Sequence, residues 1–203
     1  MGMKNLIFAI VLGSALASGI FVAVKANKPV ELQTAFVIPQ PSALPDFSLV
    51  DQFGAAVNAN TFRGQWDLVF FGFTHCPDIC PMTLQTLAGV KRELIDTGAL
   101  TLPRIVLVSV DPERDTPDLL GDYVDYFGDG NLGVTGDLED VKSLTSALGI
   151  YFEKAPTDNG NYGVDHSAAV LLINPDGEFS ALFSAPHTAA NYLHDLPIIM
   201  RGN

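Results

Sequence analysis

Residues 66–81 read WDLVFFGFTHCPDICP, and this stretch decides the fold. Its first half, residues 66–73, is a continuous apolar run, which is typical of a buried parallel strand. After residue 81, apolar side chains recur at helical spacing until Gly98, where we expect the helix to stop. The stretch therefore predicts a strand followed by a helix, with Cys76 and Cys80 at the junction.

The two cysteines allow two local geometries. A helix that begins at Pro77 would place both thiols on one face, whereas Cys80 as the N-cap would leave Cys76 in the preceding turn. Pro81 favours the second geometry, because a proline four residues into a helix removes a backbone hydrogen bond. In either case both sulfurs lie near the positive end of a helix dipole, which favours the thiolate. A thiolate binds metals or attacks disulfides, and a structural disulfide is the alternative.

The rest of the chain continues this alternation of strands and helices. We expect a hairpin over residues 46–57, a strand over 105–110, a short strand over 132–135, a helix over 138–148, a hairpin over 167–184 and a helix over 189–200. Residues 111–117 connect a strand to a helix that Thr116 caps, and Arg114 can pair locally with Asp111 or Asp115. This order predicts an α/β fold, with a central mixed sheet and helices on both faces.

The N-terminal part differs in composition from the rest. Residues 6–24 carry no charge and would form a helix of about 28 Å, close to the thickness of a bilayer's hydrocarbon core. We expect a membrane anchor or a cleaved signal segment over residues 1–25. The anchor is favoured, because the apolar run exceeds a usual signal core of roughly 7–15 residues. Four prolines predict an extended linker over residues 26–45, so the domain is expected to span residues 46–203.

Composition and charge exclude several classes of protein. Of the 203 residues, 48% are hydrophobic, and 11 Lys and Arg stand against 23 Asp and Glu, for a formal charge of -12. A chain this acidic, with no basic cluster longer than Lys91-Arg92, repels phosphate backbones, so no nucleic-acid partner is expected. Two cysteines cannot build a disulfide-rich scaffold or a four-cysteine zinc site.

Four histidines could complete a metal site with the two cysteines. His75 is adjacent to Cys76, but neighbours in an extended segment point to opposite sides. His187 and His194 fit better as surface or packing residues. His166 precedes a buried strand, where sheet loops bring side chains to the carboxyl end of the first strand. On the residues alone, none of the four is a strong candidate.

Three segments carry a resemblance that covers most of the expected domain. They are FTHCPDICP at residues 73–81, SVDPERDTP at 109–117 and VDHSAAVLLINPDG at 164–177. Together and in this order they resemble the Sco/SenC family of membrane-anchored, thioredoxin-like copper proteins. The resemblance implies a thioredoxin-like fold and a copper site, in which Cys76, Cys80 and His166 bind Cu(I) or Cu(II).

The same resemblance implies a function in the assembly of cytochrome c oxidase. Copper would be delivered to the binuclear copper centre of that enzyme, or the cysteines of the centre would be reduced. The implied partner is the oxidase's copper-bearing subunit or another copper carrier, and Cys76 and Cys80 would form a redox-active pair. The implied location is a single-pass protein of a cytoplasmic-type inner membrane, with its soluble domain on the periplasmic or equivalent extracytoplasmic side. Gly163 departs from the family pattern, because a larger apolar residue is expected there.

The chemistry of the donors agrees with copper. Two soft thiolates and one imidazole suit three-coordinate Cu(I), or Cu(II) with an added ligand, whereas a closed zinc site would want a fourth protein ligand. The alternative is a membrane-tethered thiol-disulfide oxidoreductase or peroxidase-like enzyme, because Cys76 at a helix start would be a competent nucleophile. Thioredoxin-like reductases use Cys-x-x-Cys, which is one residue shorter than the spacing here. A metallochaperone is therefore expected rather than an enzyme.

Overall fold

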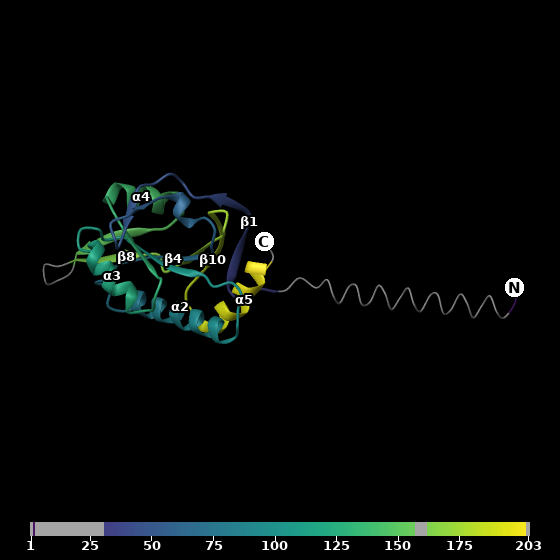
Figure 1. Ribbon diagram of the computed structural model, residues 1–203. Coiled ribbons are helices and arrows are strands. Elements are labelled where there is room, and N and C mark those ends of the chain that lie inside the picture. The colour runs from purple at the N-terminus through teal and green to yellow at the C-terminus, as the bar shows by residue number, and fades with distance from the viewer. Residues whose placement is uncertain (1, 3–30, 157–161, 202–203) are drawn as a thin grey trace. The chain divides into compact units, whose positions relative to one another are not determined.

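The computed structural model describes residues 2, 31–156 and 162–201 (Figure 1). The compact unit that carries the sheet comprises Leu32–Asn203. The membrane segment expected over residues 6–24 lies outside the described residues. Within the described ranges, no helix combines the length and the apolar character that crossing a membrane requires.

One mixed sheet forms the centre of the domain. Its strands, in spatial order, are β1 (Ala35–Ala43), β10 (Glu178–Phe183), β9 (Val170–Ile173), β4 (Asp67–Gly72), β5 (Arg104–Ser109), β6 (Leu132–Thr135), β2 (Leu49–Asp51) and β3 (Ala56–Val57). β4, β5 and β6 run parallel, and the other neighbouring pairs are antiparallel. The two expected hairpins appear as β2–β3 and β9–β10, so the predicted mixed sheet is confirmed.

Helices cover both faces of this sheet. They are the 3-10 helix η1 (Ala59–Phe62) and the α-helices α2 (Ile79–Asp96), α3 (Pro117–Asp125), α4 (Leu138–Ala147) and α5 (Ala189–Arg201). Figure 1 shows α4 on one side of the sheet and α2 with α5 on the other. Thr116 caps α3 as predicted, since its hydroxyl accepts a hydrogen bond from the Leu119 N–H at 3.3 Å. The predicted α/β architecture is confirmed.

β4 lies in the middle of the hydrophobic core, and every one of its residues is buried. Phe70 and Phe71 are fully buried, and burial of such a side chain contributes roughly 1.5–3 kcal/mol to stability. The charged residue of the strand, Asp67, is held in a two-point ion pair with Arg104, at 2.7 Å to Nε and 3.1 Å to Nη2. The carboxyl end of β4 leads directly into the cysteine segment.

The linker expected over residues 26–45 is wrong in its second half. Residues 35–43 form β1, which pairs with β10 at the edge of the sheet. The register of this pairing shifts in the middle of β1, across the positions of Pro39 and Pro41. The prolines fit there because an irregular edge strand does not need their missing N–H groups. The domain therefore begins before residue 46.

A second, two-stranded sheet was not expected from the sequence. It consists of β7 (Phe152–Pro156) and β8 (Tyr162–His166), which pair antiparallel. Within the described part of the chain, this hairpin has no ladder with the large sheet. His166 therefore ends a strand, whereas we expected it to lie in a loop.

Candidate metal centre

The two cysteines lie at the start of α2. The N-cap is Asp78, so Cys80 is the second helical residue, and Cys76 lies in the turn before the helix. The preferred geometry, with Cys80 as the N-cap, is therefore wrong. Pro81 fits inside the first turn, because the N–H groups of that turn have no intrahelical partner to lose. The prediction that both sulfurs lie close to the helix N-terminus is confirmed.

Donor atoms from distant segments meet beside this helix start. Sγ of Cys76, Sγ of Cys80 and a ring nitrogen of His166 all lie within 4.8 Å of one another. Sγ of Cys80 is 3.4 Å from Nε2 of His166. Nδ1 of His166 donates to the Ser167 carbonyl at 3.0 Å, which leaves Nε2 free to face the sulfurs. The fold thus brings together the three residues expected as ligands, and the described residues contain no other such cluster.

Apolar side chains enclose the three donors. Cys80 is fully buried, and Cys76 is 9% exposed. The imidazole of His166 meets the edges of Phe70 and Phe73, with ring centroids 5.8 Å apart in both pairs. Because Cys80 is fully buried and His166 is only partly buried, an approaching group would reach the cluster from the side of Cys76 and His166.

The two thiols differ in acidity. A hydrogen bond from the Cys80 thiol is the main cause that lowers the pKa of Cys76 to about 3; burial opposes this shift, and hydrogen bonds from the backbone N–H groups of Asp78 and Cys80 add to it. The same hydrogen bond, together with burial, raises the pKa of Cys80. Both residues are free cysteines in the structure. At neutral pH the pair therefore consists of a Cys76 thiolate and a Cys80 thiol.

The other three histidines lie outside the cluster. His75 is half exposed and bonds a neighbouring threonine hydroxyl at 3.0 Å. His187 donates to the Ala168 carbonyl at 2.6 Å, and His194 contacts the adjacent carboxylate at 2.7 Å. Each has protein partners of its own, in agreement with the surface or packing roles expected for His187 and His194.

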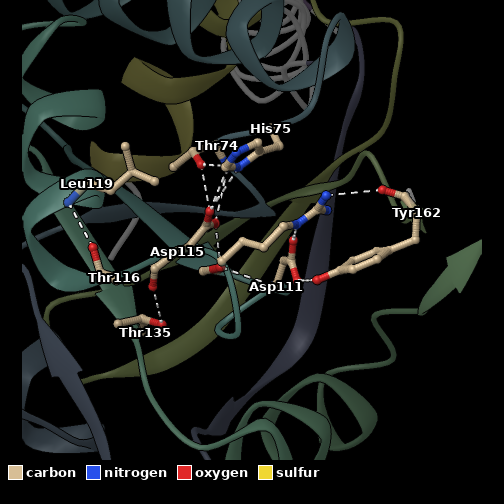
Figure 2. A network of polar contacts seen from close by, with 10 residues as sticks. Thr74, His75, Asp111, Asp115, Thr116, Leu119, Thr135 and Tyr162 are labelled. Atoms are coloured by element: carbon tan, nitrogen blue, oxygen red, sulfur yellow. Dashed lines mark hydrogen bonds and ion pairs between the residues drawn. The ribbon is translucent and has the colours of Figure 1, made fainter. Parts of the chain in front are cut away.

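A buried carboxylate holds the segment that precedes Cys76 (Figure 2). Asp115 accepts hydrogen bonds from the Thr74 N–H at 3.1 Å, the Thr74 hydroxyl at 2.6 Å and the Ser109 hydroxyl at 2.6 Å. Its side chain is fully buried. We expected residues 111–117 to act mainly as a connector and missed this role. The available signal was the density of polar side chains directly after a buried strand.

The sheet order and the helix start with two cysteines define a thioredoxin-like α/β domain. A family model described as SCO1/SenC matches residues 38–201, which is most of the chain. The chain therefore belongs to the SCO1/SenC family, and the resemblance inferred from the three sequence segments is confirmed.

Individual relatives cover the same region. A Stutzerimonas stutzeri protein named for copper binding is 35% identical over 178 residues, which is 88% of this chain and 87% of that protein. The mitochondrial SCO2 homologue of Bos taurus is 41% identical over 145 residues, which is 71% of this chain but only 54% of that protein. The crystal structure of Arabidopsis thaliana ScoI with copper bound has a TM-score of 0.75 and 32% identity, and the match covers 80% of this chain and 100% of that one.

Proposed function

We propose that this domain binds one copper ion through Cys76, Cys80 and His166 and serves as a copper chaperone in the assembly of cytochrome c oxidase. The observation that carries the proposal is the meeting of two sulfurs and an imidazole nitrogen within 4.8 Å. Membership of the SCO1/SenC family and the likeness to a copper-bound structure support the choice of metal. The domain would deliver copper to the binuclear copper centre of the oxidase, or reduce the cysteines of that centre.

The donor set suits copper better than zinc. Thiolates are soft ligands that select Cu(I), and imidazole also binds copper. The distance between two donors that share one metal ion can be estimated from the bond lengths known for zinc, about 2.0–2.3 Å. Three donors in a trigonal arrangement would then lie roughly 3.5–4 Å from one another. The distance of 3.4 Å from Cys80 Sγ to His166 Nε2 is close to this spacing. A closed zinc site needs four ligands, and the cluster in the described residues has three.

The protonation of each ligand follows from its surroundings. Cys76 is already a thiolate, because its pKa is lowered to about 3. Cys80 would give its S–H proton to solvent when the metal takes the place of that proton between the two sulfurs. The hydrogen bond from Nδ1 of His166 to the Ser167 carbonyl fixes the ring so that Nε2 points at the site.

The second candidate function is thiol-disulfide exchange at the same cysteines, and the low pKa of Cys76 favours it. The Cys76 thiolate would attack a partner disulfide and release one partner thiolate. Cys80 would then attack the mixed disulfide and release the second, so that the Cys76–Cys80 pair is oxidised and the partner is reduced. An oxidised pair offers no thiolate, so the redox state of the pair would decide whether the domain can hold copper.

We infer that the domain is tethered to a membrane. The charge-free run over residues 6–24 supports a single-pass anchor in a cytoplasmic-type inner membrane, with the domain on the periplasmic or equivalent extracytoplasmic side. Alkaline carbonate extraction of the expressed full chain tests the anchor: it should stay with the membranes, while a chain that lacks residues 1–25 should be released. Release of both chains would contradict the anchor.

A titration of the reduced chain with Cu(I), in competition with a chromogenic chelator, tests the copper function. Wild type should hold one equivalent, and Cys76→Ala, Cys80→Ala and His166→Ala should each bind more weakly. His75→Ala is the matched control, because this histidine is adjacent to Cys76 but outside the cluster. The ligand assignment is wrong if His75→Ala loses affinity while His166→Ala retains it. If wild type binds copper no more tightly than the cysteine variants but reduces disulfides rapidly, the function is thiol-disulfide exchange instead.

A further inference from the structure

The hairpin that carries His166 needs an attachment of its own, because it shares no ladder with the large sheet in the described part of the chain. Along β8, side chains alternate between two faces. Val164 is buried and therefore marks the inner face, which Tyr162 and His166 share. Asp165 on the other face is exposed. The contacts of this inner face must set the position of His166.

A closed ring of contacts fastens the far end of β8 (Figure 2). We name it the arginine clasp, and it consists of Asp111, Arg114 and Tyr162. Nε of Arg114 pairs with Oδ2 of Asp111, and Nη1 donates to the Tyr162 carbonyl at 3.1 Å. The Tyr162 hydroxyl closes the ring, since it donates to Oδ1 of Asp111 at 2.8 Å. The guanidinium carbon also lies 3.8 Å from the centroid of the Tyr162 ring.

Burial makes the clasp more than a surface ion pair. The Asp111 side chain is fully buried, and that of Arg114 is 19% exposed. A buried charge is costly unless it is paired, so loss of either partner leaves the other in an unfavourable environment. On the neighbouring strand, Lys154 lies 4.6 Å from the Tyr162 ring centroid and pairs with Glu113 at 2.7 Å. Both strands of the hairpin are thus tied to residues 111–117.

Two routes lead from the clasp to His166. Along β8, Tyr162 and His166 are four residues apart on one face, a distance of about 13 Å. Through the core, the Arg114 guanidinium lies 5.8 Å from the Phe73 ring, which meets the His166 ring edge to face at 5.8 Å. A tilt of β8 would therefore move Nε2 of His166 relative to the two sulfurs.

We propose that Asp111, Arg114 and Tyr162 are positioning residues for His166, holding β8 so that Nε2 stays beside Cys76 and Cys80. This inference rests on the proposed copper function, and none of the three clasp residues belongs to the donor cluster. The clasp sets how firmly the third donor is presented. Without it, the site would approach a two-sulfur site with a loosely held imidazole.

Two substitutions test the clasp in the metal-free protein. Tyr162→Phe removes only the hydroxyl, and Arg114→Lys keeps the charge but loses the planar fork. Tyr151→Phe is the matched control, because this exposed tyrosine lies next to the same hairpin and its hydroxyl donates to Glu153 at 2.6 Å. In both clasp variants we expect faster hydrogen exchange of the β7 and β8 amides and broadened His166 ring resonances, with the control unchanged. Wild-type behaviour of both clasp variants would overturn the inference.

Copper titration gives the second readout. Tyr162→Phe should lower Cu(I) affinity about tenfold, the low end of the range for groups that orient metal ligands. The same substitution in a His166→Ala background should have no further effect, because the donor that the clasp positions is gone. Equal losses in both backgrounds would mean that the clasp acts on the whole fold, and the inference would be wrong. If wild type binds no copper, the proposed function fails. The clasp is then tested only by the hydrogen exchange of the β7 and β8 amides and by the His166 ring resonances.

Discussion

Gly72 lies in β4 directly against the thiol of Cys80. A Cβ at this position would be 2.9 Å from Cys80 Sγ and 2.9 Å from the Phe70 ring, closer than real Cβ atoms approach. Gly72→Ala should therefore displace the Cys80 sulfur and weaken Cu(I) binding. Overpacking should also lower the free energy of unfolding by about 1–3 kcal/mol, measured by urea denaturation.

A second glycine provides the control for this substitution. Gly89 lies in α2, where the nearest atom to an added Cβ is the end of the flexible Arg92 side chain at 3.8 Å. Gly89→Ala should keep wild-type copper affinity and gain up to about 1 kcal/mol of stability from better helix propensity. If Gly72→Ala binds copper as tightly as wild type, displacement of the Cys80 sulfur does not affect copper binding, and the prediction is contradicted.

The unequal acidity of the two thiols predicts selective alkylation. The thiolate is the reactive form, and the pKa of Cys76 is lowered to about 3. Its modification by iodoacetamide should therefore have nearly the same rate at pH 5 and pH 8, followed by mass spectrometry of the cysteine peptides. A thiol with an ordinary pKa of about 8.5 would react roughly tenfold more slowly for each pH unit below that value. Such a slope for Cys76, or faster modification of Cys80, would contradict the assignment of the thiolate.

At the scale of elements, the β7–β8 hairpin is the part that sequence patterns miss. β7 reads FEKAP and β8 reads YGVDH, so neither strand has a strong apolar alternation, and one contains proline while the other contains glycine. The contacts that hold the hairpin come from Arg114, which is 48 residues from Tyr162. No local pattern reports a contact at that separation.

Gly163 offers a way to strengthen this hairpin. An added Cβ would meet only the Ala155 carbonyl oxygen, at 4.0 Å, so a larger residue fits. Gly163→Val should slow hydrogen exchange of the β8 amides and stabilise the hairpin by about 0.5–1 kcal/mol, because glycine has a high entropy cost in a strand. Copper affinity should hold or rise, as measured by chelator competition. Faster exchange in Gly163→Val would mean that glycine is required at this position.

Much of the fold could be predicted because its central strands can be recognised from short stretches of sequence. β4 and β5 contain the continuous apolar runs LVFFG and IVLV, and the start of α3 carries the Thr116 cap in its own sequence. The two cysteines stood out by their spacing at a helix start. His166 could not be separated from the other histidines on the residues alone and was found only through the family resemblance. β1 was missed because its two prolines resemble a linker, and only pairing with β10 makes it a strand.

At the scale of the whole molecule, Asp195 joins the last helix to the first strand. Its buried carboxylate accepts hydrogen bonds from the N–H groups of Gln33, Thr34 and Ala35, at 2.8–2.9 Å. Burial opposes ionisation, but these donors and His194 outweigh it, so the pKa of Asp195 lies below its ordinary value. Asp195→Asn should cost about 2–4 kcal/mol at pH 7, since the neutral amide loses the charge and one of the two oxygens that accept from the three backbone donors.

The pH dependence of this loss follows from the direction of the pKa shift. A carboxyl group with a depressed folded-state pKa contributes its full stability above its unfolded pKa of about 3.9, and the contribution fades as the pH falls through the folded value. The stability gap between wild type and Asp195→Asn should therefore be constant from pH 7 to pH 5 and narrow below about pH 4. Urea denaturation across this range measures it, with the exposed Asp122→Asn as control. A gap that widens on acidification would contradict the assigned role.

His166 ends a strand of the small β7–β8 sheet, whereas the two sulfurs lie at the start of α2. Cys80 and His166 are 86 positions apart in the chain. In the proposed function, an incoming acceptor could therefore displace the imidazole first while both sulfurs still hold the ion. The transfer would proceed as a relay of ligand substitutions, in which the coordination number changes by one at a time and the metal is never free in solution. The rate of copper transfer would then depend on the motion of the β7–β8 hairpin, and the core would not need to open.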